Sequence, residues 1–160
     1  MGDLRKPQHP QPQHIQPQHL QPQKHEVPHA EPTPVSKAYW DLCAQGQLAF
    51  QRCADCGFIN APATEVCRDC LGTRLSWEAS TGRGTLYSWT VVWRPVTPTF
   101  EVPYAPAIVE MDEGFHVVTN LIGVEPDRIE AGMPVQAEFH EVGDGLVLPY
   151  FRPYIAPAGR

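Results

Sequence analysis

Two short motifs decide the fold of this chain, Cys53-Ala54-Asp55-Cys56 and Cys67-Arg68-Asp69-Cys70. In each motif the spacing lets both sulfurs reach one metal ion about 2.3 Å away, and Gly57 after the first motif permits a tight turn. Ten residues, 57–66, separate the motifs, which is too few for two independent sites but enough for a hairpin that carries one. The spacing therefore predicts a tetrahedral site for Zn²⁺ in a small zinc ribbon, held by Cys53, Cys56, Cys67 and Cys70.

The metal is expected to have a structural role, because four thiolates fill the coordination shell and leave no position for water or substrate. Two other interpretations of the four cysteines stay open. Disulfide bonds are disfavoured because the sequence begins without an apolar signal segment and disulfides rarely persist in the cytosol. Iron held as in rubredoxin is disfavoured because the two motifs lie closer together than in an electron-transfer rubredoxin.

The N-terminal part of the chain has a different composition. A five-residue unit of Gln, Pro and His repeats there, with Ile15 and Leu20 as the aliphatic residues of two copies. Proline in each copy removes helical hydrogen bonds, and one aliphatic residue per copy buries too little area to offset the ordering entropy. We therefore expect residues 1–32 to form a disordered arm that serves as a flexible leader. A docking strip, or weak metal capture by its five histidines, is the less favoured interpretation.

The segment 33–80 is expected to hold an N-terminal helix and the ribbon. Ser36 is a candidate N-cap, aromatic residues supply an apolar helix face, and Gly46 ends the helix. Strands are predicted over 48–52 and 73–78, on either side of the cysteine motifs. The metal site and its hairpin should therefore form one module.

From residue 81 to residue 160 the pattern is that of a β-barrel. Turn sequences such as Asp112-Glu113-Gly114 separate five predicted strands, which cover 85–93, 107–111, 116–121, 135–141 and 146–151. Hairpins after the second and fourth strands, with a longer connection over 123–132, predict a five-stranded OB-fold. A helix is usual in that connection, but residues 125–130 allow one short turn at most. The predicted fold class is mainly β: a helix and zinc ribbon followed by an OB-fold barrel, preceded by the disordered arm.

Charge and hydropathy disfavour two classes of partner, nucleic acids and membranes. The formal net charge is −6, and Lys37 is the only lysine after the arm, whereas a nucleic-acid groove needs clustered Lys and Arg. No apolar run approaches the length of a membrane span. We therefore expect a soluble, cytoplasmic protein that binds neither nucleic acid nor a membrane.

Taken in this order, the motifs resemble the family long catalogued as domain of unknown function 35, in which a rubredoxin-like zinc ribbon precedes an OB-fold. The resemblance covers residues 35–154 and includes the four-cysteine ribbon, Gly82-Arg83-Gly84-Thr85 and Leu148-Pro149-Tyr150-Phe151. It implies a non-catalytic accessory subunit that completes a thiolase-like or aldolase-like enzyme acting on acyl-CoA, for example in the degradation of steroid side chains or aromatic compounds. It also implies a hetero-oligomer that shares acyl-CoA, with the partner's CoA channel approached by Pro149, Tyr150, Phe151 and Arg152.

The first barrel strand offers further candidate contacts to acyl-CoA. Trp89 and Trp93 are expected to share one strand face with Tyr87, where they could stack on adenine or line an acyl channel, although packing in the core or at an interface is the favoured explanation. Arg83 and Arg94 flank the strand and are candidates to pair with CoA phosphates.

Direct catalysis has little support in the sequence. His116 and His140 each fall in a predicted strand, and Cys43 lies in the predicted helix as a small apolar residue. No catalytic residue is predicted. The alternative function is a free-standing acyl-CoA carrier or sensor, and a nucleic-acid-binding ribbon and OB-fold protein is the third, which the charge disfavours.

Overall fold

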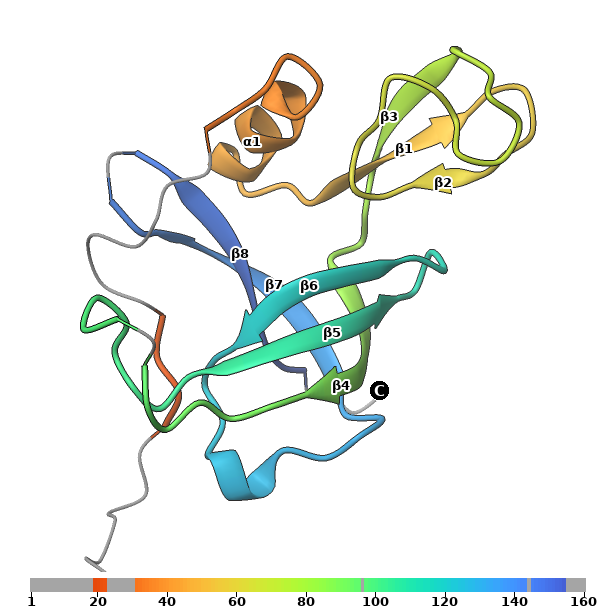
Figure 1. The fold of residues 1–160 in the computed structure, drawn as a ribbon. Coiled ribbons are helices and arrows are strands. Elements are labelled where there is room, and N and C mark those ends of the chain that lie inside the picture. Colours follow the sequence, from red (N-terminus) through yellow and green to blue (C-terminus); the bar gives the residue numbers. More distant parts are fainter. Residues whose placement is uncertain (1–18, 23–30, 96, 144, 155–160) are drawn as a thin grey trace, which may run out of the picture.

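The computed structural model describes residues 19–22, 31–95, 97–143 and 145–154. Figure 1 shows one helix, a small sheet beside it, and a barrel below both. The predicted fold class is confirmed by this arrangement. The elements in chain order are α1 (Lys37–Ala44), β1 (Ala49–Cys53), β2 (Ile59–Asn60), β3 (Leu75–Ala79), β4 (Arg83–Trp89), β5 (Ala105–Met111), β6 (His116–Leu121), the 3₁₀ turn η1 (Pro126–Arg128), β7 (Pro134–Glu141) and β8 (Val147–Pro153).

Helix α1 begins after Ser36, as the sequence predicts, but the serine does not cap it with its side chain. Its hydroxyl oxygen instead accepts a hydrogen bond from the backbone N–H of Thr33, at 2.9 Å. Gly46 follows the helix with a φ of +73°, a conformation that glycine adopts without steric cost. Within the described residues, no helix is long and apolar enough to cross a membrane.

The ribbon is a three-stranded antiparallel sheet in the order β2-β1-β3. Strand β1 lies at its centre, where Gln51 is opposite Asn60 on one side and Trp77 on the other. The sequence predicts one strand before the cysteine motifs and one after them, and β2 is an additional two-residue strand. It is too short for a periodic pattern to reveal it.

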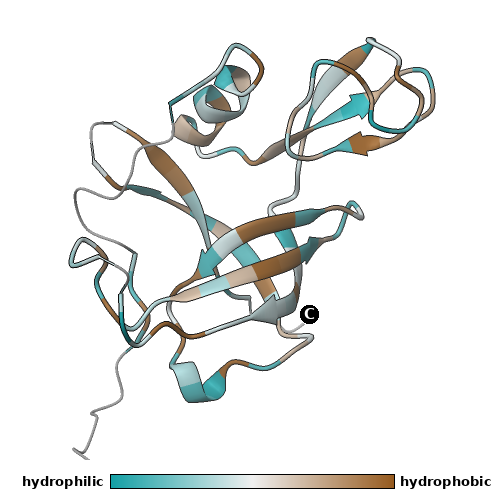
Figure 2. Ribbon diagram, viewed as in Figure 1, coloured by the Kyte–Doolittle hydropathy of each residue, from teal (hydrophilic) through white to brown (hydrophobic). Residues whose placement is uncertain are grey.

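The barrel closes in the strand order β4-β5-β6-β8-β7. Its neighbouring strands are antiparallel except for β6 and β8, which run parallel and meet at Leu121 and Phe151. Alternate residues of β5 face the interior, with Val109 and Met111 among them. The period of two in the sequence therefore has the expected result, and the apolar bands on β5, β6 and β8 can be followed in Figure 2.

Strand β4 departs from the predicted pattern. It ends at Trp89, and its register with β5 shifts between Leu86 and Ser88. Tyr87 lies at this bulge with 62% of its surface exposed, whereas Trp89 is half-buried against the core. The prediction that Tyr87, Trp89 and Trp93 share one strand face is therefore wrong, because the extra residue of the bulge breaks the alternation and the strand ends before Trp93.

The ribbon and the barrel share one hydrophobic core. Leu48 and Phe50 of the ribbon belong to the same buried cluster as the inner residues of the barrel, and the rings of Phe50 and Phe115 lie 5.1 Å apart between centroids. The connection between the two parts is also held by hydrogen bonds. The carboxylate of Glu113 accepts one from the Ser80 hydroxyl at 3.1 Å and one from the Thr81 N–H at 2.6 Å.

One residue of the arm is part of this core. The side chain of Leu20 is fully buried, its N–H donates to the carbonyl of Val124 at 3.0 Å, and its own carbonyl accepts from the N–H of Gly123 at 2.9 Å. Leu20 therefore packs against the barrel although it lies in the segment 1–32, for which the sequence predicts a disordered arm. The expectation of disorder for arm residues 1–18 and 23–30 concerns residues outside the described part of the chain.

Candidate metal centre and apolar groove

The four cysteines of the two motifs come together at the tip of the ribbon. Their Sγ atoms all lie within 4.8 Å of one another, and the distances from Cys53 to Cys70 and from Cys56 to Cys67 are both 3.6 Å. Four sulfurs about 2.3 Å from a tetrahedral Zn²⁺ lie about 3.8 Å from each other, so the cage has the size that this ion requires. None of the cysteines is paired in a disulfide, which leaves the metal site as the interpretation that fits.

Two similar turns position these sulfurs. In the first turn the N–H of Gly57 donates to the carbonyl of Cys53, and in the second the N–H of Leu71 donates to the carbonyl of Cys67. Gly57 and Leu71 occupy equivalent places, and both have positive φ angles, +79° and +61°. A leucine in this conformation costs about 1–2 kcal/mol relative to an ordinary backbone. The second turn therefore holds a strained residue, and the cage must be favourable enough to maintain it.

Polar contacts fix the second turn against the rest of the ribbon. The fully buried Asn60 accepts a hydrogen bond from the Arg68 N–H at 3.0 Å, and Arg74 forms an ion pair with Asp55 of the first turn. Gly72 lies so close to Asp55 that a Cβ atom on it would collide with the carboxylate. The two turns are therefore joined through side chains as well as through the sulfurs.

The electrostatics of the cage favour a bound cation. Burial raises the pKa of the Cys67 thiol, but hydrogen bonds from the N–H groups of Cys70 and Asp69 have the opposite and larger combined effect, so that the pKa falls to about 6. The N–H of Phe58 lowers the pKa of Cys56, but burial and the neighbouring sulfurs raise it to about 12. Four adjacent thiols cannot all ionise without a compensating positive charge. A divalent cation would supply that charge, so the donor set fits a structural metal ion.

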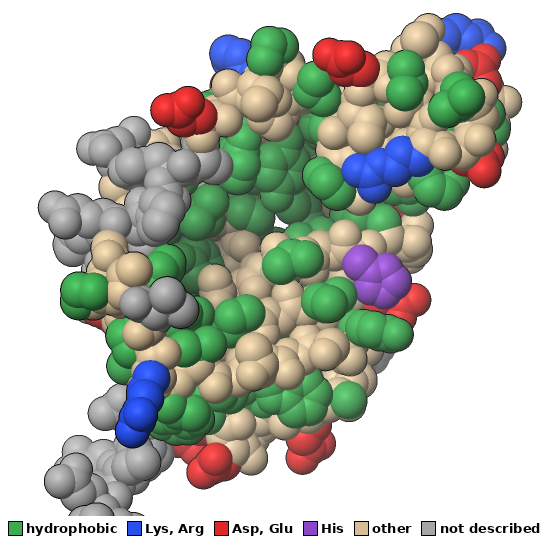
Figure 3. Space-filling view, in the orientation of Figure 1, with side chains coloured by type: hydrophobic (Ala, Val, Ile, Leu, Met, Phe, Trp, Pro, Cys, Tyr) green, Lys and Arg blue, Asp and Glu red, His purple; other side chains and the backbone are tan. Residues whose placement is uncertain are grey.

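An apolar groove lies between α1, the ribbon and the outer face of β6. Figure 3 shows hydrophobic side chains gathered in this hollow. It has a volume of about 360 Å³ and is lined by Tyr39 and Trp40 of the helix, Phe50 and Trp77 of the ribbon, and Val118 of β6. Val118 is 81% exposed, although it is a strand residue with an apolar side chain. The groove therefore exposes apolar surface to water, which is unfavourable in free energy.

The groove continues toward β8 on the other side of α1. A second hollow, of about 270 Å³, shares Tyr39, Trp40 and Val118 with the first and extends to Pro149 and Tyr150. The predicted residues Pro149 and Tyr150 therefore lie next to an apolar surface. The sequence contained a signal for this surface, because Val117 and Val118 are adjacent in a strand and cannot both face the interior.

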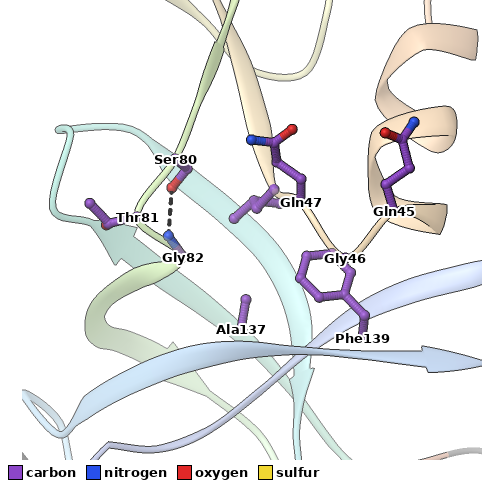
Figure 4. Close-up of a pocket in the computed structure, with 9 residues that line it drawn as sticks. Gln45, Gly46, Gln47, Ser80, Thr81, Gly82, Ala137 and Phe139 are labelled. Carbon is purple, nitrogen blue, oxygen red and sulfur yellow. Dashed lines mark hydrogen bonds between the residues drawn. The ribbon is translucent and has the colours of Figure 1, made fainter.

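A further hollow, of about 490 Å³, lies where the end of α1 meets the ribbon-barrel connection and β7 (Figure 4). Gln45 and Gln47 border it on one side, and the Ser80 hydroxyl accepts a hydrogen bond from the Gly82 N–H at 3.0 Å on the other. No titratable side chain is among the described residues that line it. It therefore provides no acid or base for catalysis.

The predicted contacts near the C-terminus lie at different depths. Phe151 is fully buried in the barrel core, and Tyr150 is 3% exposed. Arg152 is at the surface, where it donates to Glu138 at 2.9 Å. Burial opposes ionisation of Glu138, but hydrogen bonds from Arg152 and His140 hold its pKa below the usual value. Pro149 and Arg152 are thus the members of this group that a ligand can reach directly.

The candidates around β4 are not brought together in one place. Arg83 lies at the start of the strand with its guanidinium 4.6 Å from the centre of the Tyr154 ring. Trp89 closes the other end of the strand and packs against the core, while Trp93, 50% exposed, and Arg94 follow in the next loop. Arg83 and Arg94 therefore lie at opposite ends of β4, and the structure does not form a single phosphate site from them.

Comparison with known proteins identifies both parts of the chain. Residues 40–76 match the family model "ChsH2, rubredoxin-like zinc ribbon domain", and residues 77–140 match "ChsH2, C-terminal OB-fold domain". The structure of the "Ltp2-ChsH2(DUF35) aldolase" contains a chain that is 37% identical, with a TM-score of 0.73, and the match covers 78% of this chain and 98% of that one.

Two curated relatives place the chain more widely. The "Probable enoyl-CoA hydratase alpha subunit" of Thermomonospora curvata is 40% identical over 119 residues, which are 74% of this chain and 37% of the relative, so the chain spans little more than a third of that protein. A "DUF35 domain-containing scaffold protein" of Pyrococcus furiosus is 31% identical over 134 residues, which are 78% of this chain and 96% of the relative. With a ribbon and a barrel that both match, this chain belongs to the DUF35 family of ChsH2-type zinc ribbon and OB-fold proteins.

Proposed function

We propose that this chain is a non-catalytic, zinc-stabilised accessory subunit that docks on a thiolase-like or aldolase-like enzyme and completes it for work on acyl-CoA. One observation carries the proposal: a chain of the Ltp2-ChsH2(DUF35) aldolase is matched over 98% of its length at 37% identity. The hydratase alpha subunit and the scaffold protein support the same kind of role by their names. No paired acid and base is among the described residues that line the three hollows, which agrees with a subunit that shapes another protein's site.

In this proposal the metal is Zn²⁺, one per chain, held by Cys53, Cys56, Cys67 and Cys70. The ion would supply structural cross-linking, since the four sulfurs fill its shell. Reduced thiols are expected in the cytoplasm, which is where we place the protein. We also keep the division into an arm (1–32), a helix and ribbon (33–80) and a barrel (81–160) as part of the proposal, with Leu20 as a point at which the arm contacts the barrel.

The groove beside α1 is the surface that we assign to the enzyme partner. Trp40 and Val118 line both of its hollows, and Val118 is 81% exposed. Large contiguous apolar surfaces on a folded chain commonly mark protein interfaces. Pro149 lines the part of the groove near β8, and Arg152 is close to it in the chain. We propose that these two residues face the acyl-CoA that the partner binds, while Phe151 supports them from the core.

The test is co-expression with a thiolase-like enzyme encoded by a neighbouring gene, followed by size-exclusion chromatography and an activity assay. The two proteins should elute together, and the enzyme alone should be less active. Val118→Asp should separate them because it places a charge in the groove. Val102→Asp is the matched control, since Val102 is an exposed valine, 39% accessible, that does not line the groove. Separate elution of the unmodified proteins, with full activity of the enzyme alone, would overturn the proposal.

A second candidate function is a free-standing acyl-CoA carrier. It is favoured by the volume of the groove, about 360 Å³, which lies in the range of small-molecule sites. Titration calorimetry of the chain alone with acyl-CoA separates the two functions. The carrier function requires binding at micromolar strength, whereas the subunit function requires none in the absence of the partner.

A further inference from the structure

One end of the barrel is left without a covering helix. The connection between β6 and β7 contains only the three-residue turn η1, and none of the residues of that turn is buried. Apolar residues of the barrel nonetheless approach this end, since Leu121, Val124 and Ile129 are all buried. Something other than the turn must therefore exclude water from them.

Leu20 of the arm fills this position. Its side chain is fully buried in the same cluster as Leu121, Val124 and Ile129. Its two backbone hydrogen bonds, to Val124 at 3.0 Å and from Gly123 at 2.9 Å, form a short β-like pair with the connection. The arm thus provides the apolar side chain that a helix would otherwise provide.

The contact is confined to one residue and its immediate neighbours. His19 and Gln21 on either side of Leu20 are exposed, and Pro22 has no N–H with which to continue the pairing. His19 lies 3.6 Å from the carboxylate of Glu125, the residue that also binds Arg128 of the turn. Recognition therefore depends on one aliphatic side chain, two backbone hydrogen bonds and one nearby acidic group. Such a contact is weak for a free peptide but is favoured for a segment tethered to the same chain.

The sequence repeats the features that this contact uses. Leu20 is part of Gln18-His19-Leu20-Gln21-Pro22, and the unit before it is Gln13-His14-Ile15-Gln16-Pro17. We propose that the barrel end formed by Gly123, Val124 and Glu125 is a peptide-docking socket whose ligand is this chain's own arm, bound through the aliphatic residue of a Gln-His-aliphatic-Gln-Pro unit. The repeat supplies two such ligands, with Ile15 and Leu20 as the anchors. This role lies outside the accessory-subunit function and does not depend on it.

The first test is amide hydrogen exchange on the full chain with its metal bound. The Gly123 N–H donates to the arm, while the neighbouring Ile122 N–H donates to Phe151 inside the barrel and serves as an internal reference. In the double variant Ile15→Asp/Leu20→Asp, Gly123 should exchange at least tenfold faster while Ile122 is unchanged. The control Gln16→Asp/Gln21→Asp adds the same charge at neighbouring positions and should leave both amides as they were. Equal exchange at Gly123 in all three chains would overturn the proposal, as would a dependence of its protection on protein concentration, which would make a second copy the donor of the arm.

The second test is fluorescence anisotropy with a labelled peptide of residues 16–24. The double variant has no anchor of its own and should bind this peptide at least tenfold more tightly than the unmodified chain does. A peptide of residues 11–18, which carries Ile15, should bind as well, whereas a 16–24 peptide with Leu20→Asp should not. If the aspartates disturb the β-sheet circular dichroism, Ile15→Ala/Leu20→Ala replaces them. A folded double variant that binds neither unmodified peptide would overturn the proposal.

Discussion

The ribbon and the barrel are both small β-structures, but they are stabilised in different ways. The barrel closes on itself and buries inward side chains from all of its strands. The outer part of the ribbon leaves Phe58, Val66 and Leu71 exposed, and its buried positions include the sulfurs of Cys53 and Cys67. A sheet of this size has too little apolar surface to fold independently. We therefore expect the outer part of the ribbon to depend on metal binding for its stability, whereas hydrophobic burial is sufficient for the barrel.

The largest effect is expected from Cys56→Ser. Loss of one of the four ligands should weaken metal binding by more than about 100-fold, because loss of a group that only orients a ligand already costs 10–100-fold. The ribbon should lose its order while the barrel keeps its fold. Zinc content and amide hydrogen exchange in the ribbon and in the barrel measure this. Cys43→Ala is the control, since Cys43 is buried outside the cage, and zinc bound equally well by Cys56→Ser would contradict the proposed role of the cage.

Phe151→Ala should destabilise the barrel and leave the ribbon's metal site in place. The side chain is fully buried, and removal of a buried phenylalanine costs about 3–5 kcal/mol of unfolding free energy. Metal binding should be retained because the cage is in the ribbon. Chemical denaturation with a zinc assay tests both points. Trp93→Ala, at a residue 50% exposed, should cost about 1 kcal/mol or less, and similar losses for both variants would show that Phe151 does not anchor the core.

Glu113→Gln probes the connection between the two parts. The carboxylate accepts hydrogen bonds from the Ser80 hydroxyl and the Thr81 N–H. A hydrogen bond to a charged group contributes about 1.5–3 kcal/mol to the free energy of unfolding. We expect a loss in that range and a separation of the ribbon and barrel unfolding transitions in calorimetry. Asp112→Asn at the exposed neighbouring position is the control. A single, unshifted transition in Glu113→Gln would mean that the shared core alone couples the two parts.

The smallest effect is expected from Glu138 on the surface of the barrel. Its folded-state pKa is lowered from an ordinary value of 4.5 by Arg152 and His140, although burial opposes this. The contribution to stability is therefore present above pH 4.5 and is lost as the pH falls through the lower folded-state pKa. The Glu138 side chain is 36% exposed, so the contribution should be below about 1 kcal/mol. Glu138→Gln should remove this part of the acid dependence in urea titrations between pH 7 and pH 3, and an unchanged dependence would contradict it.

The sequence predicts the parts of the fold that depend on local spacing. The cysteine motifs indicate the ribbon, and the alternation in residues 107–111 and 116–121 matches β5 and β6. The bulge at Tyr87 could not be found in this way, because it results from the register between β4 and β5. Leu20 was missed for a similar reason. Its side chain is buried against one end of the barrel, and that end exists only after the strands have come together.

The candidate site also has a part that the sequence predicts and a part that only the structure shows. Spacing alone indicates the four ligands, since Cys53, Cys56, Cys67 and Cys70 are close in the chain. The groove leaves only a partial signal in the sequence, the adjacent Val117 and Val118, because Trp40 and Val118 come together only when α1 lies against the barrel. The strained backbone of Leu71 was also hidden, since leucine rarely adopts a positive φ. Motifs built from local spacing are thus readable in the sequence, whereas surfaces formed between elements require the structure.

The most direct test of the account is amide hydrogen exchange of the full chain before and after a chelator removes its metal. One Zn²⁺ per chain should be present at the start. After removal, the amides of Gly57 and Leu71, which donate within the two cysteine turns, should exchange rapidly, while the Ile122 amide in the barrel should keep its protection. Absence of a stoichiometric metal, or unchanged protection of Gly57 and Leu71 once it is removed, would contradict a ribbon that is organised by its metal.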